Sequence, residues 1–328
     1  MKKEIKYIDL FSGIGGFRLG LDKLNLKCVM SSDIDKNCRK VYKENFNDKP
    51  YGDIHEVSEF IVPDHNILTG GFPCQPFSIC GKQKGFKDDR GNLFYEIIRI
   101  VNFKRPKVVF LENVKHLKNH DGGNTLSVII DTLEGLGYKT SWKVLNGKDF
   151  GVPQNRERII IVSSMEKYFD FSKVKNLDTL KIKDILEEKG DFEYLNNEEY
   201  TILDNEIVKT QKSGLRFIGY RNKKIRDKGT RPNTEHLSRV HKQPNRIYCS
   251  EGTHPTIPSQ ETSGRFWIYH QEKVRKLTLK ECYRLNGFPS DFKNSSTKGE
   301  QYKQIGNSVV IPMITEIGRE IVNQFFKE

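Results

Sequence analysis

The segment that decides the fold is Ile5-Lys-Tyr-Ile-Asp-Leu-Phe-Ser-Gly-Ile-Gly-Gly-Phe-Arg-Leu-Gly20. Its apolar start, Ile5 to Phe11, predicts a buried strand, and the glycines after it allow a tight turn into a helix that we expect to reach Leu24. Glycines at such a turn also let the backbone approach a ligand closely. The spacing G-x-G-G-x-x-x-G differs from the dinucleotide fingerprint, so the pattern alone leaves an ordinary tight turn open.

Short apolar runs and helical patterns alternate from this segment to about residue 165. The later strands that we expect are 28–32, 66–69, 108–111, 139–145 and 158–163, and the helices are one ending at Asn45, one over 92–103 and one over 125–136. Strands and helices that alternate at this spacing predict an α/β fold with a mostly parallel sheet wrapped by helices.

The character of the sequence changes near residue 184. Residues 184–206 hold nine acidic residues and one Lys, whereas 213–246 hold ten Lys or Arg and two acidic residues. Helical periodicity is weak up to about Gly264, which predicts a smaller, irregular, β-leaning domain. Thr278-Leu-Lys-Glu281 has the form of a capping box ahead of a helix to Asn286, and 309–326 is again helical.

Composition narrows the class of protein. The 328 residues carry a net charge of +12, which indicates a polyanionic partner, although a solvated lysine-rich surface would give the same balance. A mean hydropathy of −0.64 and the lack of an apolar run near ~20 residues exclude an integral membrane protein. With no signal-peptide pattern, we expect a cytoplasmic protein. The six cysteines include no C-x-x-C pair, so neither a zinc site nor a disulfide framework is expected.

Several polar residues stand where strands are predicted to end. In Gly70-Gly-Phe-Pro-Cys-Gln-Pro-Phe-Ser78, rigid neighbours bracket Cys74, which favours a nucleophilic thiol over a buried small side chain. Asp33 lies twenty residues after Gly13, a place that suits a carboxylate bound to ribose hydroxyls. Glu112 could be a general acid or an ordinary strand-terminal carboxylate. Arg156 and Arg158 are expected on one face of a strand, facing a ligand or forming a surface ion pair.

The chain resembles the bacterial DNA (cytosine-5)-methyltransferases of restriction–modification systems. The resemblance covers nearly all of residues 4–165 and 273–328. Its motifs stand in the family's order: D-L-F-S-G-I-G-G-F, G-G-F-P-C-Q-P-F-S, R-G-N-L-F, E-N-V, Q-N-R-E-R, R-K-L-T-L-K-E-C-Y-R-L-N-G-F-P and Q-I-G-N-S-V. Any one of them could arise by chance, whereas the ordered set is typical of the family.

The resemblance implies a Rossmann-like large domain that binds S-adenosylmethionine and a smaller β-rich target-recognition domain. The limits that we expect are 1–183 for the catalytic domain, 184–277 for the recognition domain, 278–306 for a hinge helix and connection, and 307–328 for a return to the catalytic domain. The implied partner is double-stranded DNA, from which the target cytosine is flipped out because a side chain cannot reach its ring inside the stack. We expect no metal and a monomer. A cognate restriction endonuclease acting on the same site without direct contact is left open.

Carried over residue by residue, the resemblance makes Cys74 the nucleophile, Glu112 the acid at the base ring and Arg158 a ligand of the base carbonyl, with Arg156 grouped beside them. The implied cofactor residues are Phe11, Ser12, Gly13, Gly15, Gly16, Asp33, Ile34, Asp53, Ile54, Gly71, Pro73, Leu93, Asn307 and Val309. The expected DNA-binding residues, from the basic loop 78–92, the basic segment 216–246 and a Thr-Ile pair, are Ser78, Cys80, Lys82, Gln83, Arg90, Arg221, Arg226, Arg231, Arg239, Arg246, Thr256 and Ile257.

Three positions depart from the family's pattern. Asp33 stands where Glu is usual, Ile34 where relatives carry Trp, and Cys80 where a relative has Ser; the first two bear on cofactor affinity and the third on a DNA contact of the loop. Two other functions share parts of the pattern, a tRNA cytosine-5 methyltransferase and a catalytically silent DNA-binding relative. The long basic segment, which lacks a C-F-T signature, disfavours the first, and the complete catalytic set disfavours the second. A nicotinamide-dependent enzyme does not fit the glycine spacing.

Overall fold

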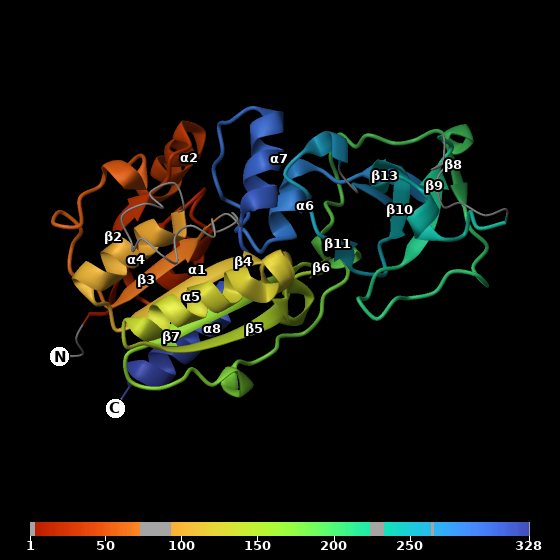
Figure 1. Ribbon diagram of the computed structural model, residues 1–328. Helices are drawn as coiled ribbons and strands as arrows, with labels where there is room; N and C mark the ends of the chain where they lie inside the picture. The colour runs from red at the N-terminus through yellow and green to blue at the C-terminus, as the bar shows by residue number, and fades with distance from the viewer. Residues whose placement is uncertain (1–3, 73–92, 224–232, 264–265, 328) are drawn as a thin grey trace. The chain divides into compact units, whose positions relative to one another are not determined.

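The computed structural model describes residues 4–72, 93–223, 233–263 and 266–327 (Figure 1). The chain divides into two compact units. Unit 1 comprises Met1–Leu145, Glu157–Lys175 and Val309–Glu328, and unit 2 comprises Asn146–Arg156 and Asn176–Ser308. Within the described residues, no helix combines the length and apolar character needed to cross a bilayer. The domain limits expected from the sequence stay a prediction. By packing, residues 146–156 and 278–308 belong to the same unit as residues 184–277.

Unit 1 is built on a six-stranded sheet with the strand order β2-β1-β3-β4-β7-β5. β1 pairs in parallel with β2 and β3, and β3 pairs in parallel with β4, so the expected mostly parallel sheet is confirmed. β7 differs from these strands because it pairs antiparallel with β4. The strands are β1 (Lys6–Leu10), β2 (Lys27–Ser32), β3 (Ile67–Gly71), β4 (Val108–Val114), β5 (Lys139–Asn146) and β7 (Glu157–Ser164).

Successive residues of a strand point to opposite faces of the sheet, so the apolar strands present apolar side chains on both faces. Helices cover both of these faces. On one face, Val109 and Leu111 of β4 join a core with the apolar sides of α4 (Leu93–Lys104) and α5 (Asn124–Gly135). On the other face, Phe110 packs edge-to-face against Phe17 of α1 (Gly16–Asp22) at 5.1 Å between ring centroids. Figure 1 shows α5 in front of the sheet and α8 (Ile311–Phe325) behind it. The remaining α-helix of the described part of unit 1 is α2 (Lys36–Phe46).

Close approach of α1 and α8 depends on two glycines. A Cβ on Gly20 would lie 2.8 Å from the Ile314 side chain, and one on Gly318 would lie 2.6 Å from Leu21. Because neither glycine carries a side chain, the C-terminal helix can pack directly on the first helix of the chain. The last residues of the sequence therefore stabilise the helix that follows the glycine turn.

Unit 2 holds a five-stranded sheet with the order β13-β12-β10-β9-β8, which confirms the expected β-rich character of this region. Its core is small and includes Ile218, Ile247, Trp267 and Val274. A two-stranded parallel pair joins β6 to β11. The strands are β6 (Gln154–Asn155), β8 (Tyr200–Ile202), β9 (Phe217–Arg221), β10 (Arg246–Cys249), β11 (His254–Pro255), β12 (Trp267–His270) and β13 (Lys273–Lys276).

Two helices follow this sheet in unit 2. The predicted capping box is present at α6 (Leu279–Arg284), where the Thr278 hydroxyl accepts from the backbone N–H of Glu281 and the Glu281 carboxylate accepts from that of Thr278. The helix ends two residues earlier than expected. α7 (Lys298–Asn307) was not predicted from the sequence, because Gly299 in its first turn and the polar residues around it weaken the helical pattern.

Candidate active site

The site in unit 1 lies where the parallel strands end. Leu10 at the end of β1 is in register with Ser32 of β2 and Gly70 of β3, and Gly71 is in register with Glu112 of β4. The residues that follow β1 and β2, and those that end β3 and β4, therefore share one edge of the sheet. Ligands bind at this edge in open α/β sheets.

The glycine turn after β1 has an unusual backbone. Phe11, Gly13 and Gly15 have φ values of 55°, 52° and 89°, and Gly15 forms the N-cap of α1. A Cβ on Gly15 would lie 2.2 Å from the Phe46 ring, so this position needs glycine, whereas a Cβ on Gly13 would meet nothing within 4 Å. The Ser12 hydroxyl is buried and has no hydrogen-bond partner among the described residues. Open space beside an unsatisfied polar group fits a ligand that lies against this turn.

Asp33 links the turn to the end of β2. One of its carboxylate oxygens accepts from the N–H of Gly13 and the other from that of Asp35, each at 2.8 Å. Burial raises the pKa of Asp33, and the two backbone donors oppose this shift. Arg39 donates to the carbonyls of Asp33 and Ile34 at 2.7 and 2.9 Å and so fixes their backbone.

Ile34 and the segment after α2 complete this part of the site. The aliphatic side chain of Ile34 is 70% exposed next to the half-buried Asp33, as expected for a residue that would cover an apolar group of a ligand. The backbone N–H of Asp33 donates to the carbonyl of Tyr51, which brings Asp53 and Ile54 to the same strand end. Asp53 caps a short 3-10 helix, and the backbone N–H of His55 lowers its pKa, while Ile54 is buried.

Glu112 and Arg158 form an ion pair across β4 and β7. The Arg158 Nε lies 3.0 Å from the Glu112 Oε1, and each side chain is 11% exposed. Burial lowers the pKa of Arg158, and the Glu112 carboxylate opposes that shift. A Cβ on Gly71 would lie 3.7 Å from the second carboxylate oxygen of Glu112, so β3 ends against this pair. The site thus holds a largely buried acid and a largely buried cation in direct contact.

Asn113 ties β4 to the chain that leads to the predicted nucleophile. Its buried side-chain amide donates to the carbonyl of Phe72 at 2.8 Å. Phe72 is the last described residue before Cys74, which lies outside the described residues. The other predicted site residues outside them are Pro73, Ser78, Cys80, Lys82, Gln83, Arg90, Arg226 and Arg231.

Comparison with known proteins shows the family of the chain. The family model described as C-5 cytosine-specific DNA methylase matches residues 5–323. The chain belongs to this family. It is therefore a DNA cytosine-5 methylase by family, and S-adenosylmethionine is the methyl donor that the family uses. The expected fold and activity are both confirmed.

Curated relatives match the methylase over almost its whole length. The type II methyltransferase M.HhaI of Haemophilus parahaemolyticus is 41% identical over 97% of this chain and 94% of its own. The type II methyltransferase M.HaeII of Haemophilus aegyptius is 40% identical over 98% of this chain and 94% of its own. Among solved structures, the Entamoeba histolytica methyltransferase EhMeth aligns with a TM-score of 0.68 at 20% identity, covering 99% of this chain and 100% of its own. This likeness shows the shared fold.

The remaining predicted cofactor residues lie on both units. Leu93 begins α4 and packs against the core of unit 1, and Val309 of the same unit is buried. Asn307 ends α7 in unit 2 and is exposed. The resemblance to the family placed these three residues in one set, whereas the structure distributes them between two separately packed units.

Arg156 has different partners from Arg158. It belongs to unit 2, is 1% exposed, and donates to the carbonyls of Gly306 and Ser308 at 2.7 and 2.6 Å. The sequence predicted that both arginines would lie on one strand face, where they would face a ligand or form a surface ion pair. The difference arises because β6 and β7 are separate strands, with Arg156 between them.

The predicted DNA-binding residues that the structure describes differ in exposure. Arg239 is exposed, whereas the Arg221 guanidinium lies 5.0 Å from the centroid of the Trp267 ring, and Arg246 donates to the carbonyl of His241 at 3.0 Å. The Thr256 hydroxyl donates to the Asn155 carbonyl at 2.7 Å, and the Ile257 side chain is fully buried. Thr256 and Ile257 therefore both bind β6 within unit 2, the first through its hydroxyl and the second through its backbone N–H.

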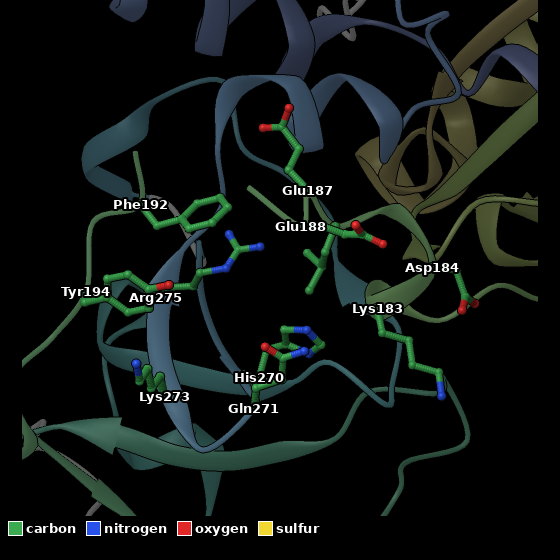
Figure 2. Close-up of a pocket in the computed structure, with 11 residues that line it drawn as sticks. Lys183, Asp184, Glu187, Glu188, Phe192, Tyr194, His270, Gln271, Lys273 and Arg275 are labelled. Atoms are coloured by element: carbon green, nitrogen blue, oxygen red, sulfur yellow. The ribbon is translucent and has the colours of Figure 1, made fainter. Parts of the chain in front are cut away.

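A cavity of about 700 Å³ in unit 2 was not predicted from the sequence. Figure 2 shows Arg275 reaching into it beside Phe192, whose ring centroid lies 4.1 Å from the guanidinium. Arg275 is already paired with Glu281 through two contacts of 2.9 and 2.7 Å. Because its cation is neutralised within the unit, the cavity does not by itself indicate an anionic ligand. Its lining combines residues far apart in the sequence, which no local pattern could reveal.

Proposed function

We propose that this methylase transfers the methyl group of S-adenosylmethionine to carbon 5 of a cytosine flipped out of a specific double-stranded DNA sequence. In this proposal Cys74 is the nucleophile, Glu112 and Arg158 bind the base ring, and the glycine turn with Asp33 binds the cofactor. The enzyme is the methylase of a type II restriction–modification system, and the methylation that it introduces protects host DNA, as the names of the relatives suggest. The enzyme acts as a monomer in the cytoplasm.

The observation that carries the proposal is the Glu112–Arg158 pair beside the end of β3. Cytosine presents a ring nitrogen and a carbonyl oxygen side by side, so a carboxyl and a guanidinium in direct contact match both atoms. The 3.0 Å contact holds the two groups close enough to bind neighbouring atoms of one base. Their low exposure strengthens such hydrogen bonds, because water competes less for them.

The residues divide the chemistry into steps. The Cys74 thiolate adds to carbon 6 of the ring and forms a C–S bond, which makes carbon 5 nucleophilic. With its carboxyl protonated, Glu112 protonates or hydrogen-bonds ring nitrogen 3, and Arg158 hydrogen-bonds to the carbonyl oxygen, so both stabilise the charge displaced by addition. Bound S-adenosylmethionine would supply the methyl group from its sulfonium sulfur to carbon 5 and would leave as S-adenosylhomocysteine. A solvent water then removes the carbon 5 proton, the C–S bond breaks to regenerate the Cys74 thiolate, and ring nitrogen 3 returns any proton it received to Glu112.

The residues at the glycine turn suit the parts of the cofactor. The Asp33 carboxylate can accept from the ribose hydroxyls, and Ile34 offers an exposed apolar side chain to the adenine. The buried Ser12 hydroxyl and the open space at Gly13 suit the polar remainder of the molecule. Because the adenine meets Ile34 instead of an aromatic ring, dispersion and apolar contact replace ring stacking at this position.

The nucleophile can be tested with a trapped substrate. In duplex DNA that carries 5-fluorocytosine at the target position, the proton that must leave carbon 5 after methyl transfer is replaced by fluorine, so the C–S bond cannot break. We expect a denaturation-resistant protein–DNA adduct for the native enzyme with S-adenosylmethionine. Cys74→Ser should form no adduct and no product while it still binds the duplex. An adduct formed by the Cys74→Ser variant would refute this role.

The protective role and the substrate are tested in cells and in vitro. Bisulfite sequencing of host DNA that expresses this chain should show methylation at every copy of one short sequence, and scattered methylation would contradict the restriction–modification role. Methyl transfer to duplex DNA and to tRNA should be compared side by side. We expect product with DNA only, and a faster reaction on tRNA would favour the RNA alternative.

A further inference from the structure

Arg156 lies in the part of unit 2 where the chain returns to unit 1, and its side chain is buried. Its guanidinium donates to the carbonyls of Gly306 and Ser308 at 2.7 and 2.6 Å and reaches the carbonyl of Ile257 at 3.4 Å. Guanidinium groups suit several acceptors at once because their donors are fixed in one plane. These contacts join the Q-N-R-E-R motif to the last turn of α7.

The two shorter contacts of Arg156 flank a single residue, Asn307. Carbonyls at the C-terminal end of a helix have no partners within the helix, and a cation there is stabilising. Arg156 therefore fixes the backbone immediately before and after Asn307, while the Asn307 side chain stays exposed. Arg39 makes the same kind of contact at the other cofactor segment, with the carbonyls of Asp33 and Ile34.

The surroundings leave this segment little freedom. A Cβ on Gly306 would lie 2.4 Å from the carbonyl oxygen of Pro258, so α7 touches that backbone directly. Gln154 is fully buried, donates to the carbonyl of Leu285 and the side-chain oxygen of Asn286, and accepts from the N–H of Ile257. A rigid frame thus holds the segment 154–156 against the residues on either side of Asn307.

We propose that Arg156 is a positioning residue for the cofactor. It fixes the backbone of Asn307 so that the exposed side chain meets S-adenosylmethionine in one conformation, and its own contacts go to backbone carbonyls instead of to the cytosine. The inference rests on the proposed function, in which Asn307 is a cofactor residue. It assigns the two arginines of one motif to different tasks, Arg158 to the base and Arg156 to cofactor affinity.

The test is Arg156→Lys, because an ammonium keeps the charge but cannot hold two flanking carbonyls in one plane. We expect the Kd of S-adenosylhomocysteine, measured calorimetrically without DNA, to rise about tenfold, as for the loss of about one charged hydrogen bond. The KM for S-adenosylmethionine should rise in parallel. The kcat at saturating cofactor and the Kd for duplex DNA should stay within about a factor of two of the native values.

The matched control is Arg319→Lys, since Arg319 is 49% exposed and pairs only with Glu316 one turn away in the contacts that the structure gives for its side chain. This variant should leave the Kd of S-adenosylhomocysteine unchanged. If Arg156→Lys does not fold, Arg156→Gln provides the second variant, because its amide can still donate to one of the two carbonyls. For either variant, a lower kcat at saturating cofactor with unchanged binding of S-adenosylhomocysteine would overturn the inference and assign Arg156 to the base.

Asn307→Ala separates failure of the inference from failure of the proposed function. If Asn307→Ala leaves the Kd of S-adenosylhomocysteine unchanged, the assignment of Asn307 to the cofactor is wrong. If it raises the Kd while Arg156→Lys does not, only the positioning role is wrong. When both hold, the double variant should bind no more weakly than Asn307→Ala by itself, because Arg156 acts through that side chain. Additive effects would contradict the coupling.

Discussion

Gly306→Ala is the substitution whose cost follows most directly from the packing of unit 2. The added Cβ would lie 2.4 Å from the oxygen and 2.5 Å from the carbon of the Pro258 carbonyl, and 2.5 Å from the Cα of Ser259. All three atoms belong to the backbone, so no side chain can rotate away. To restore ordinary contact distances, α7 or the 258–259 segment must move by about 1 Å.

The magnitude follows from two opposing effects. Overpacking of a well-packed site costs about 1–3 kcal/mol, and the upper part of this range applies because the clash is with backbone. Replacing Gly by Ala in a helix returns at most about 1 kcal/mol, and less near the end of α7 where Gly306 lies. We therefore expect Gly306→Ala to lower the free energy of unfolding of unit 2 by about 2 kcal/mol.

Gly299→Ala in the same helix is the matched control. A Cβ at Gly299 would meet nothing within 4 Å, so only the helix propensity changes. This variant should raise the free energy of unfolding by about 0.5–1 kcal/mol. The same substitution is thus expected to act with opposite signs at two positions of one helix.

The chain offers a direct assay, because its two tryptophans lie in different units. Trp142 belongs to unit 1 and Trp267 to unit 2, so in a Trp142→Phe background the fluorescence follows the unfolding of unit 2. With a slope of about 4 kcal/mol per molar guanidinium chloride, Gly306→Ala should lower the midpoint by about 0.5 M. A midpoint equal to or above that of Gly299→Ala would refute the reasoning.

Two further substitutions test the acids of unit 1. Asp9 is fully buried, and burial raises its pKa from 3.8 to about 8. Because the folded state binds this proton more tightly than the unfolded state, the linked contribution to the free energy of unfolding is complete below about pH 4. It is lost as the pH rises towards 8. Asp9→Asn should therefore flatten the decline of Tm between pH 5 and 8.5, and parallel Tm profiles would contradict this. Asp33→Ala should raise the Kd of S-adenosylhomocysteine about 10- to 100-fold through the loss of two hydrogen bonds, with duplex binding as the control; an unchanged Kd would exclude the ribose contact.

The sequence predicted the sheet of unit 1 well because its signals are local. Apolar runs such as 108–111 and the glycines after β1 each indicate their structure within a few residues. The α7 helix escaped prediction because its start depends on the Thr297 cap, whose hydroxyl accepts from the N–H of Glu300, while Gly299 obscured the pattern. The stabilisation of the helix start by the Thr297 cap outweighed the low helix propensity of Gly299. A count of helix-forming residues does not include the effect of a cap.

The site could be predicted only in part, since its contacts join distant residues. The Glu112–Arg158 pair depends on the antiparallel register of β4 and β7, and strand order cannot be read from the letters of either strand. The resemblance to the family brought both residues into one set but did not indicate their direct contact. It likewise grouped Arg156 with them, because a motif lists neighbours in sequence without their partners in space.

The Q-N-R-E-R motif shows why a matched motif does not by itself assign chemistry. The chain passes from unit 2 to unit 1 between Arg156 and Glu157, in the middle of the motif. Before that point, Gln154 and Arg156 bind backbone and side chains of unit 2, and after it Arg158 binds the acid of β4. Five adjacent letters therefore combine a connection between two units with one residue of the proposed active site. A substitution in such a motif that abolishes activity cannot identify a catalytic residue until its effects on the cofactor, the DNA and folding have been measured separately.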